Sequence, residues 1–249
     1  MIILASDQIG YKVVEYFIEK NEPISALVLD TKNRGNFNKK IIEKYQSKFK
    51  NNEIYYETDL KDNETLERLQ DVKSVYGILA WWPYIIKEKL LSIPKKGWIN
   101  FHPSYLPFNK GKHSSFWCLV DETQCGVSLQ IIDEGIDTGD IIARKKINVS
   151  WEDNGEILYN KCRDETFELF KENFNDIKND KIKRTKQIPN EGTYHHSSEL
   201  SKIINLDLES SYELKKLLNI LRGKIKPYAY FYDNDKKFSV EIIIKEEKD

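Results

Sequence analysis

The sequence lacks any long hydrophobic run and contains little cysteine. No apolar stretch approaches the roughly 20 residues that a helix needs to cross a membrane, so we expect no membrane partner. The three cysteines, Cys118, Cys125 and Cys162, are an odd number and lack the spacing of a metal site. We therefore expect three reduced thiols in a cytoplasmic protein, and no bound metal.

An excess of charge of either sign is also missing. The 39 basic and 40 acidic residues among 249 nearly cancel, which gives no electrostatic reason to expect a nucleic-acid partner. Segment 1–6 is apolar for only a few residues and has no basic region before it, which predicts a strand rather than a signal peptide. Segment 7–10 lacks the Gly-x-Gly-x-x-Gly pattern, which weakens the case for a bound dinucleotide.

Short apolar runs alternate with segments of helical periodicity along most of the chain. The runs at 2–6 and 24–29 flank a predicted helix at 10–20, an order typical of a right-handed crossover between parallel strands. This alternation places the chain in the α/β class, with a doubly wound, mostly parallel sheet. The pattern also predicts helices over 32–52 and 153–179 and strands over 75–80, 98–101, 126–132 and 141–149.

The carboxyl-terminal segment has a different pattern. The aromatic run 228–232 and the apolar run 238–244 flank a polar turn, which predicts a β-hairpin. We expect residues 1–200 to form the main domain and residues 201–249 a small helix-and-hairpin extension. A helix with an apolar packing face is predicted from the spacing of Leu214, Leu217, Leu218 and Leu221.

Three polar residues mark the candidate site. Asn100 and His102 are two positions apart on a predicted strand, so their side chains point to the same face. Asp137 follows in a turn between Gly135 and Gly139. An amide, an imidazole and a carboxylate supply an oxyanion donor, a proton acceptor and an orienting group, which acyl transfer requires. Taken singly, each of these residues is more typical of a turn.

The surrounding residues strengthen this hypothesis through a family resemblance. Asn100-x-His102-Pro103-Ser104-x-Leu106-Pro107, with the later Asp137-Thr138-Gly139-Asp140-Ile141, resembles the formyltransferases that use 10-formyltetrahydrofolate as co-substrate. The resemblance covers roughly residues 1–200 and implies that Asn100, His102 and Asp137 are the catalytic residues. It implies no metal, because the formyl group is already activated.

A narrower resemblance, to the sugar N-formyltransferases, implies formyl transfer to the amine of a nucleotide-linked aminodideoxy sugar for surface polysaccharide (O-antigen) biosynthesis. The first choice of acceptor is dTDP-4-amino-4,6-dideoxyglucose, and the 3-amino isomer is the next. This resemblance rests on Ala80-Trp81-Trp82-Pro83, on Gly111-Lys112-His113-Ser114-Ser115-Phe116-Trp117 and on Pro227-Tyr228-Ala229-Tyr230-Phe231-Tyr232.

The resemblance also implies where the substrates bind. Lys112 and His113 would meet the diphosphate of the sugar nucleotide, although a solvated loop explains them as well. The base would stack on an aromatic side chain, for which strand packing is the alternative. The candidates for that stacking are Tyr228, Tyr230 and Phe231. The folate would contact Ala80, Trp81, Trp82, Pro83, Tyr84 and Ile85, with Asp133 and Gly135, and core packing explains the two tryptophans equally well.

Other functions stay open at this point. The acceptor could be glycinamide ribonucleotide, which would leave residues 205–249 surplus, or methionyl-tRNA, whose enzymes carry a larger basic carboxyl domain. A formate-releasing hydrolase would share the same three residues, whereas a non-catalytic nucleotide-binding module would not need them. The adjacent His195 and His196 lack a third metal ligand at suitable spacing, which favours polar loop residues.

The hairpin at 228–244 also predicts a homodimer. A two-stranded element is marginal by itself and needs a partner surface, and symmetric dimers are the commonest soluble oligomers.

Overall fold

A seven-stranded sheet forms the centre of the molecule in the computed structural model, which describes residues 1–31, 37–49 and 52–247. The strand order is β3-β2-β1-β4-β5-β7-β8. Neighbouring strands from β3 to β5 pair in parallel, whereas β7 pairs antiparallel with both β5 and β8. The predicted mostly parallel α/β sheet is therefore confirmed. Its strands are β1 (Ile2–Ala5), β2 (Ala26–Leu29), β3 (Ile54–Tyr56), β4 (Gly77–Ala80), β5 (Trp98–His102), β7 (Gly126–Ile131) and β8 (Ile141–Lys146).

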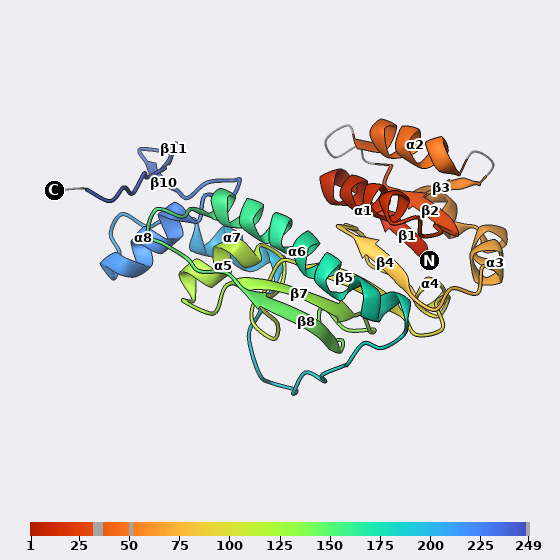
Figure 1. Ribbon diagram of the computed structural model, residues 1–249. Helices are drawn as coiled ribbons and strands as arrows, with labels where there is room; N and C mark the ends of the chain where they lie inside the picture. The colour runs from red at the N-terminus through yellow and green to blue at the C-terminus, as the bar shows by residue number, and fades with distance from the viewer. Residues whose placement is uncertain (32–36, 50–51, 248–249) are drawn as a thin grey trace.

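Helices cover both faces of this sheet, which is why its strands are apolar on both sides (Figure 1). On one face, α1 (Asp7–Glu19) and the long α6 (Gly155–Lys178) share a core in which Phe17 packs against Phe174 at 5.1 Å between ring centroids. On the other face, α3 (Asn63–Asp71) and α4 (Glu88–Leu91) enclose the buried Trp98. The helix α2 (Phe37–Lys48) packs against α1.

Short elements complete the described part of the chain. The strand β6 (Lys110–Gly111) pairs in parallel with β9 (Tyr194–His195), far along the sequence. In Figure 1, β1 to β3 lie at one end of the molecule and α8 with the hairpin lies at the other. The remaining elements are η1 (Glu57–Lys61), α5 (Ser114–Val120), α7 (Ser197–Ile203), α8 (Leu214–Arg222) and the hairpin strands β10 (Tyr230–Asp233) and β11 (Lys236–Ser239).

The carboxyl-terminal segment packs against α5 through a core of its own. Phe116 and Trp117 of α5 meet Ile204, Ile220 and Ala229 there. The three cysteines are free and buried, as expected for small core residues. Within the described residues, no helix combines the length and the apolar character that crossing a membrane requires.

The predicted leucine face of α8 is confirmed only in part: Leu221 packs against the carboxyl-terminal core, and Leu217 and Leu218 are half-buried. The buried side of this helix carries Asn219, Ile220 and Arg222, while Leu214 is 69% exposed. The reason is the Arg222 guanidinium, which donates to the backbone carbonyls of Ser150 and Trp151 at 2.8 and 3.1 Å. These hydrogen bonds turn a charged side chain inward, and leucine spacing alone does not predict that orientation.

Several predicted boundaries also change. The helix predicted over 32–52 contains α2 at 37–48, and residues 32–36 and 50–51 lie outside the described residues. The second hairpin strand ends at Ser239 rather than at residue 244. Neither β3 nor α3 was predicted, because segment 54–71 is polar. The single fully buried residue of α3, Leu69, is too little to produce a helical pattern of apolar residues.

Candidate active site

Strand β5 carries Asn100 and His102 on one face, as the alternation predicts. Ile99 and Phe101 point into the core beneath α1 and α6, whereas Trp98 belongs to the core on the opposite face. His102 is buried and Asn100 is half-buried. Open α/β sheets bind ligands at the carboxyl ends of their parallel strands, so both side chains lie where a substrate can reach them.

The turn between β7 and β8 brings Asp137 to His102. Its Oδ1 lies 3.3 Å from Nδ1 of His102, and both side chains are largely shielded from solvent. Gln130 Nε2 donates to the same Oδ1 at 2.9 Å, and the backbone N–H of Gly111 donates to Oδ2 at 2.9 Å. Because two donors hold the carboxylate, it can orient the imidazole and stabilise it when protonated.

Gly111 holds the carboxylate from a conformation that requires glycine. Its φ is +92°, and an added Cβ would lie 2.6 Å from the backbone oxygen of His195 in β9. A side chain would therefore push β6 and β9 apart and move the N–H that contacts Asp137.

The ring nitrogen of His102 that faces away from Asp137 is Nε2. This buried atom has no hydrogen-bond partner among the described residues. Buried polar atoms nearly always have a partner, so the arrangement favours a substrate group at this position. With Asp137 beside Nδ1, the second ring nitrogen can accept a proton, since a neutral imidazole donates from one nitrogen and accepts at the other.

The segment after β4 combines core and loop environments. Ala80 ends the strand, and Trp82 is buried in the core of the α3–α4 face, which supports core packing for this residue. Trp81 has a φ of +60° and donates from Nε1 to the hydroxyl of Tyr159 at 2.9 Å. The side chain of Trp82 therefore lies in the core, whereas that of Trp81 contacts Tyr159 of α6.

The residues after Trp82 become more exposed to solvent along the chain. Pro83 and Tyr84 are half-buried, and the Tyr84 hydroxyl donates to Asp30 Oδ1 at 2.6 Å. Ile85 is 87% exposed.

Asp133 and Gly135 shape the turn that carries Asp137. Oδ1 of Asp133 accepts hydrogen bonds from the Gly135 N–H at 3.1 Å and from the Thr138 hydroxyl at 2.7 Å. Such a self-bonded turn fixes the backbone locally. Asp133 and Gly135 are exposed, next to the equally exposed Ile136.

Pro103, which follows His102 in the chain, lines a cavity of about 420 Å³. His113 and Tyr228 also line this cavity, whereas Lys112, Tyr230 and Phe231 do not. Burial and the nearby Lys112 lower the pKa of His113, so its imidazole is neutral at pH 7. Phe231 instead stacks on Phe238 within the hairpin, and Tyr230 packs in the carboxyl-terminal core.

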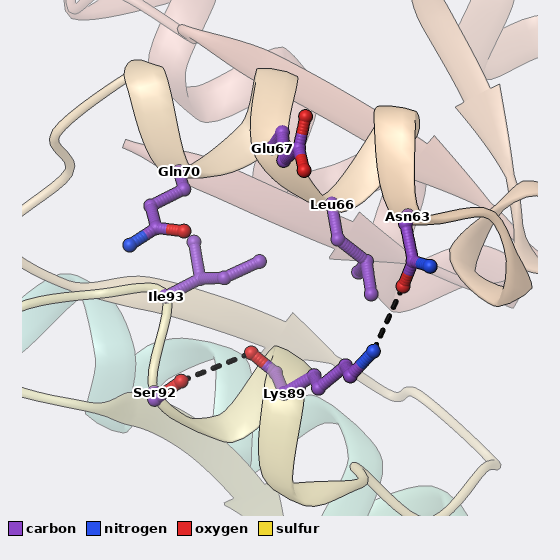
Figure 2. Close-up of a pocket in the computed structure, with 7 residues that line it drawn as sticks. All are labelled: Asn63, Leu66, Glu67, Gln70, Lys89, Ser92 and Ile93. Atoms are coloured by element: carbon purple, nitrogen blue, oxygen red, sulfur yellow. Dashed lines mark hydrogen bonds between the residues drawn. The ribbon is translucent and has the colours of Figure 1, made fainter.

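A second cavity lies away from these residues, between α3 and α4 (Figure 2). Asn63 and Lys89 face each other across it, with 2.8 Å between Oδ1 and Nζ. None of the predicted site residues lines this groove.

Sequence reasoning missed several residues of the site. Lys224 and Lys226 line the 420 Å³ cavity, and their spacing of two before Tyr228 was a usable signal. Glu156 and Tyr159 enter the same cavity from α6, and nothing in their local sequence connects them with β5. Gln130 sits directly opposite Asn100 in the β5–β7 pair, a position that only the strand register reveals.

Comparisons with known proteins all indicate formyltransferases. A family model described as Formyl transferase matches residues 8–173. Methionyl-tRNA formyltransferase from Thermodesulfovibrio yellowstonii is 30% identical over 183 residues, which cover 73% of this chain and 58% of that protein. The chain thus spans less than two thirds of that relative's length.

Solved structures share the fold over longer stretches. A 4-N formyltransferase from Francisella tularensis superimposes with a TM-score of 0.81 at 21% identity, covering 99% of this chain and 98% of that one. An N-formyltransferase from Helicobacter canadensis, solved with folinic acid and dTDP-3-aminofucose, gives a TM-score of 0.71 at 22% identity, covering 94% and 85%. At these identities the likeness shows a common fold.

Proposed function

The chain belongs to the formyl transferase family, and from this premise we propose that it transfers a formyl group from 10-formyltetrahydrofolate to the amine of a nucleotide-linked aminodideoxy sugar. One observation carries the proposal. The buried His102 has Asp137 at Nδ1 and an unpartnered Nε2, and the next residue, Pro103, lines a cavity together with two lysines and two tyrosines.

His102 is proposed to move the proton. The acceptor amine must attack the formyl carbon while neutral, and the new C–N bond forms as the amine nitrogen becomes positively charged. Nε2 of His102 takes the proton from that nitrogen and returns it to the folate nitrogen as the old C–N bond breaks. Asp137 stabilises the imidazolium between these two events.

Asn100 is proposed to stabilise the charge that develops on oxygen. As the amine adds, the formyl oxygen becomes negative, and the Asn100 side-chain N–H can donate to it. A donor of this kind contributes about 3–4 kcal/mol to the transition state. Asn100 and His102 share one face of β5, so both can act on a single carbonyl group.

The 420 Å³ cavity suits a sugar nucleotide. Lys224 and Lys226 supply positive charge for a diphosphate, and Tyr228 offers an aromatic face for the base. Glu156 adds an acceptor for sugar hydroxyls. Tyr228 and His113 are thus kept as substrate-binding residues, while Lys112, Tyr230 and Phe231 are candidates outside this cavity.

The folate is assigned to the other predicted segments. When bound, it supplies the activated formyl group. We place its flat ring against the backbone of 80–85 and the turn 133–135, where Ile85 and Ile136 are 87% and 53% exposed. The same fold holds folinic acid in the Helicobacter canadensis enzyme, which supports this assignment.

A second candidate acceptor is methionyl-tRNA, because the Thermodesulfovibrio yellowstonii relative is 30% identical. Coverage favours the sugar, since this chain spans 98% of the Francisella tularensis 4-N formyltransferase and 58% of the tRNA enzyme. Residues 201–249 would then be the extension that borders the acceptor cavity of a main domain at 1–200.

We assign the protein to the cytoplasm, where charged folates and sugar nucleotides occur.

The acceptor assignment predicts a ranking of substrates. With 10-formyltetrahydrofolate present, we expect turnover with dTDP-4-amino-4,6-dideoxyglucose, slower turnover with the 3-amino isomer, and none with glycinamide ribonucleotide or methionyl-tRNA. The folate absorbance measures the rate, and a reaction without acceptor measures formate release. Formylation of methionyl-tRNA or glycinamide ribonucleotide without formylation of any sugar nucleotide would overturn the assignment, as would an equal rate without acceptor.

We also propose a homodimer formed through the carboxyl-terminal hairpin. Tyr232 and Phe238 are exposed on this two-stranded element, and Leu214 of α8 is exposed as well. A second copy would cover this apolar surface.

The dimer predicts a mass of about twice 29.4 kDa by light scattering at micromolar concentration. Replacing Tyr232 and Phe238 by Lys is expected to yield the monomer, because charged edge strands oppose pairing. Replacing the exposed Tyr194 by Lys is the matched control and leaves the mass unchanged. A monomeric unaltered chain contradicts the proposal, and a dimer that persists in the double variant moves the interface elsewhere.

A further inference from the structure

Two glutamines from distant parts of the chain converge on Asp137. Gln130 on β7 is completely buried, and its Nε2 donates to the Asp137 carboxylate at 2.9 Å. Gln187, in the segment between α6 and β9, donates from Nε2 to the backbone oxygens of Asp137 and Gly139, both at 2.8 Å. One glutamine therefore holds the side chain of Asp137 and the other holds its backbone.

The orientation of both amide groups follows from their partners. A carboxylate and a backbone carbonyl only accept hydrogen bonds, so each glutamine must present its nitrogen. Gln187 uses both of its N–H groups, one for each carbonyl. The amide oxygens of the two side chains are buried and unpartnered among the described residues. A buried amide oxygen without a partner lowers the stability of the fold, so core packing alone does not explain a glutamine at either position. The hydrogen bonds that both side chains donate to Asp137 do explain them.

Gln130 contacts the carboxylate oxygen of Asp137 that faces His102. It reaches Oδ1 of Asp137, the same oxygen that lies 3.3 Å from Nδ1 of His102. Together with the Gly111 N–H on Oδ2, it prevents rotation of the carboxylate away from the imidazole. Because neither glutamine is one of the three residues assigned to the chemistry, their action would be indirect.

The backbone contact of Gln187 has a separate reason. Asp137 has a φ of +55°, a left-handed conformation that aspartate enters more often than most residues but that is stabilised by hydrogen bonds from its surroundings. The turn has its own hydrogen bonds through Asp133, but those leave the carbonyl of Asp137 itself without a partner. Gln187 supplies that partner from outside the turn.

We propose that Gln130 and Gln187 are positioning residues that fix Asp137 against His102, Gln130 through the carboxylate and Gln187 through the left-handed backbone. This inference rests on the proposed formyl transfer for its kinetic consequence. Its structural consequence, the position of the proton on the His102 ring, does not depend on which acceptor is used.

The kinetic test uses Gln130→Met and Gln187→Met, which keep the side-chain length and remove the donor. We expect kcat to fall about 100-fold for Gln130→Met and about tenfold for Gln187→Met, because misplacing a catalytic group by about 1 Å has effects of this size. KM for both substrates should stay within about twofold, since neither glutamine is proposed to bind them. Gln130→Glu should be at least as slow as Gln130→Met, because a second carboxylate repels Asp137.

Gln124 provides a matched control on the same stretch of chain. Its Nε2 also donates to a backbone carbonyl, that of Cys125, at 2.8 Å. It lies six positions before Gln130 and precedes the start of β7. We expect Gln124→Met to keep the kcat of the unaltered protein.

The second readout is the ring tautomer of His102, measured by ¹⁵N NMR on protein labelled at its four histidines. In the unaltered protein we expect the proton on Nδ1, facing Asp137, and in Gln130→Met a mixture of both tautomers. A single Nδ1–H tautomer together with an unchanged kcat in Gln130→Met would overturn the proposal. If the unaltered protein formylates no acceptor, the proposed function fails, and the tautomer still decides whether Gln130 positions Asp137.

Discussion

Replacing His102 by Ala is expected to lower kcat about 1,000-fold, within the range that removal of a general acid–base group produces. The chain should stay folded, because the ring lies at the carboxyl end of β5 and its Nε2 has no partner among the described residues to lose. Steady-state rates with the best acceptor measure the effect, and circular dichroism checks the fold.

His196→Ala is the matched histidine control. His196 is exposed and caps α7 through its contact with the Ser198 N–H, so we expect a stability loss of about 1 kcal/mol or less and an unchanged kcat. If His102→Ala works within about threefold of the unaltered protein, the histidine does not move the proton and the mechanism is wrong.

Replacing Asn100 by Ala is expected to lower kcat about 100- to 1,000-fold, which corresponds to the loss of one oxyanion donor. The KM for either substrate should change little, because the proposed hydrogen bond strengthens only as charge develops on the formyl oxygen. Asn100→Asp should be slower still, since a carboxylate at this position repels the developing negative charge.

The control for this prediction is Asn63→Ala in the groove between α3 and α4 (Figure 2). It removes a side-chain amide of the same kind, whose partner is the exposed Lys89, and leaves kcat unchanged. A loss confined to KM in Asn100→Ala would assign Asn100 to binding rather than to the transition state.

The strands of the sheet were predictable because the physics that forms them is local. Buried strands of this sheet are short apolar runs, and β1, β2, β4, β5 and β7 all begin and end within a few residues of their predicted limits. Two of the elements that were missed, β3 and α3, are polar and bury little, so their formation depends on neighbours distant in sequence. The extent of α6 was also predictable from local sequence, because the Asn154 side chain caps its first turn.

The pairing of Asn100 with His102 was predictable from the period of a strand, while the contact with Asp137 came from the family resemblance. Period 2 places both side chains on one face regardless of the rest of the fold. No such period connects residues 35 positions apart, and their distance of 3.3 Å depends on the antiparallel β5–β7 pairing.

The acceptor cavity shows where prediction from sequence ends. Aromatic residues at 228, 230 and 231 were equivalent candidates, yet Tyr228 alone of the three reaches the cavity. The hairpin decides this, because its pairing places Phe231 on Phe238 and its bridge to Asn205 places Tyr230 in a core.

By itself, the sequence determined the class of fold, the strand that carries Asn100 and His102, and the near neutrality that gives no electrostatic reason to expect a nucleic-acid partner. These depend on composition and on periodicities of a few residues. Only the tertiary structure decided which groups hold Asp137, which lysines border the cavity and which side of α8 is buried. Each of these depends on contacts between segments far apart in the chain, and such contacts follow from strand order and register, which local patterns do not encode.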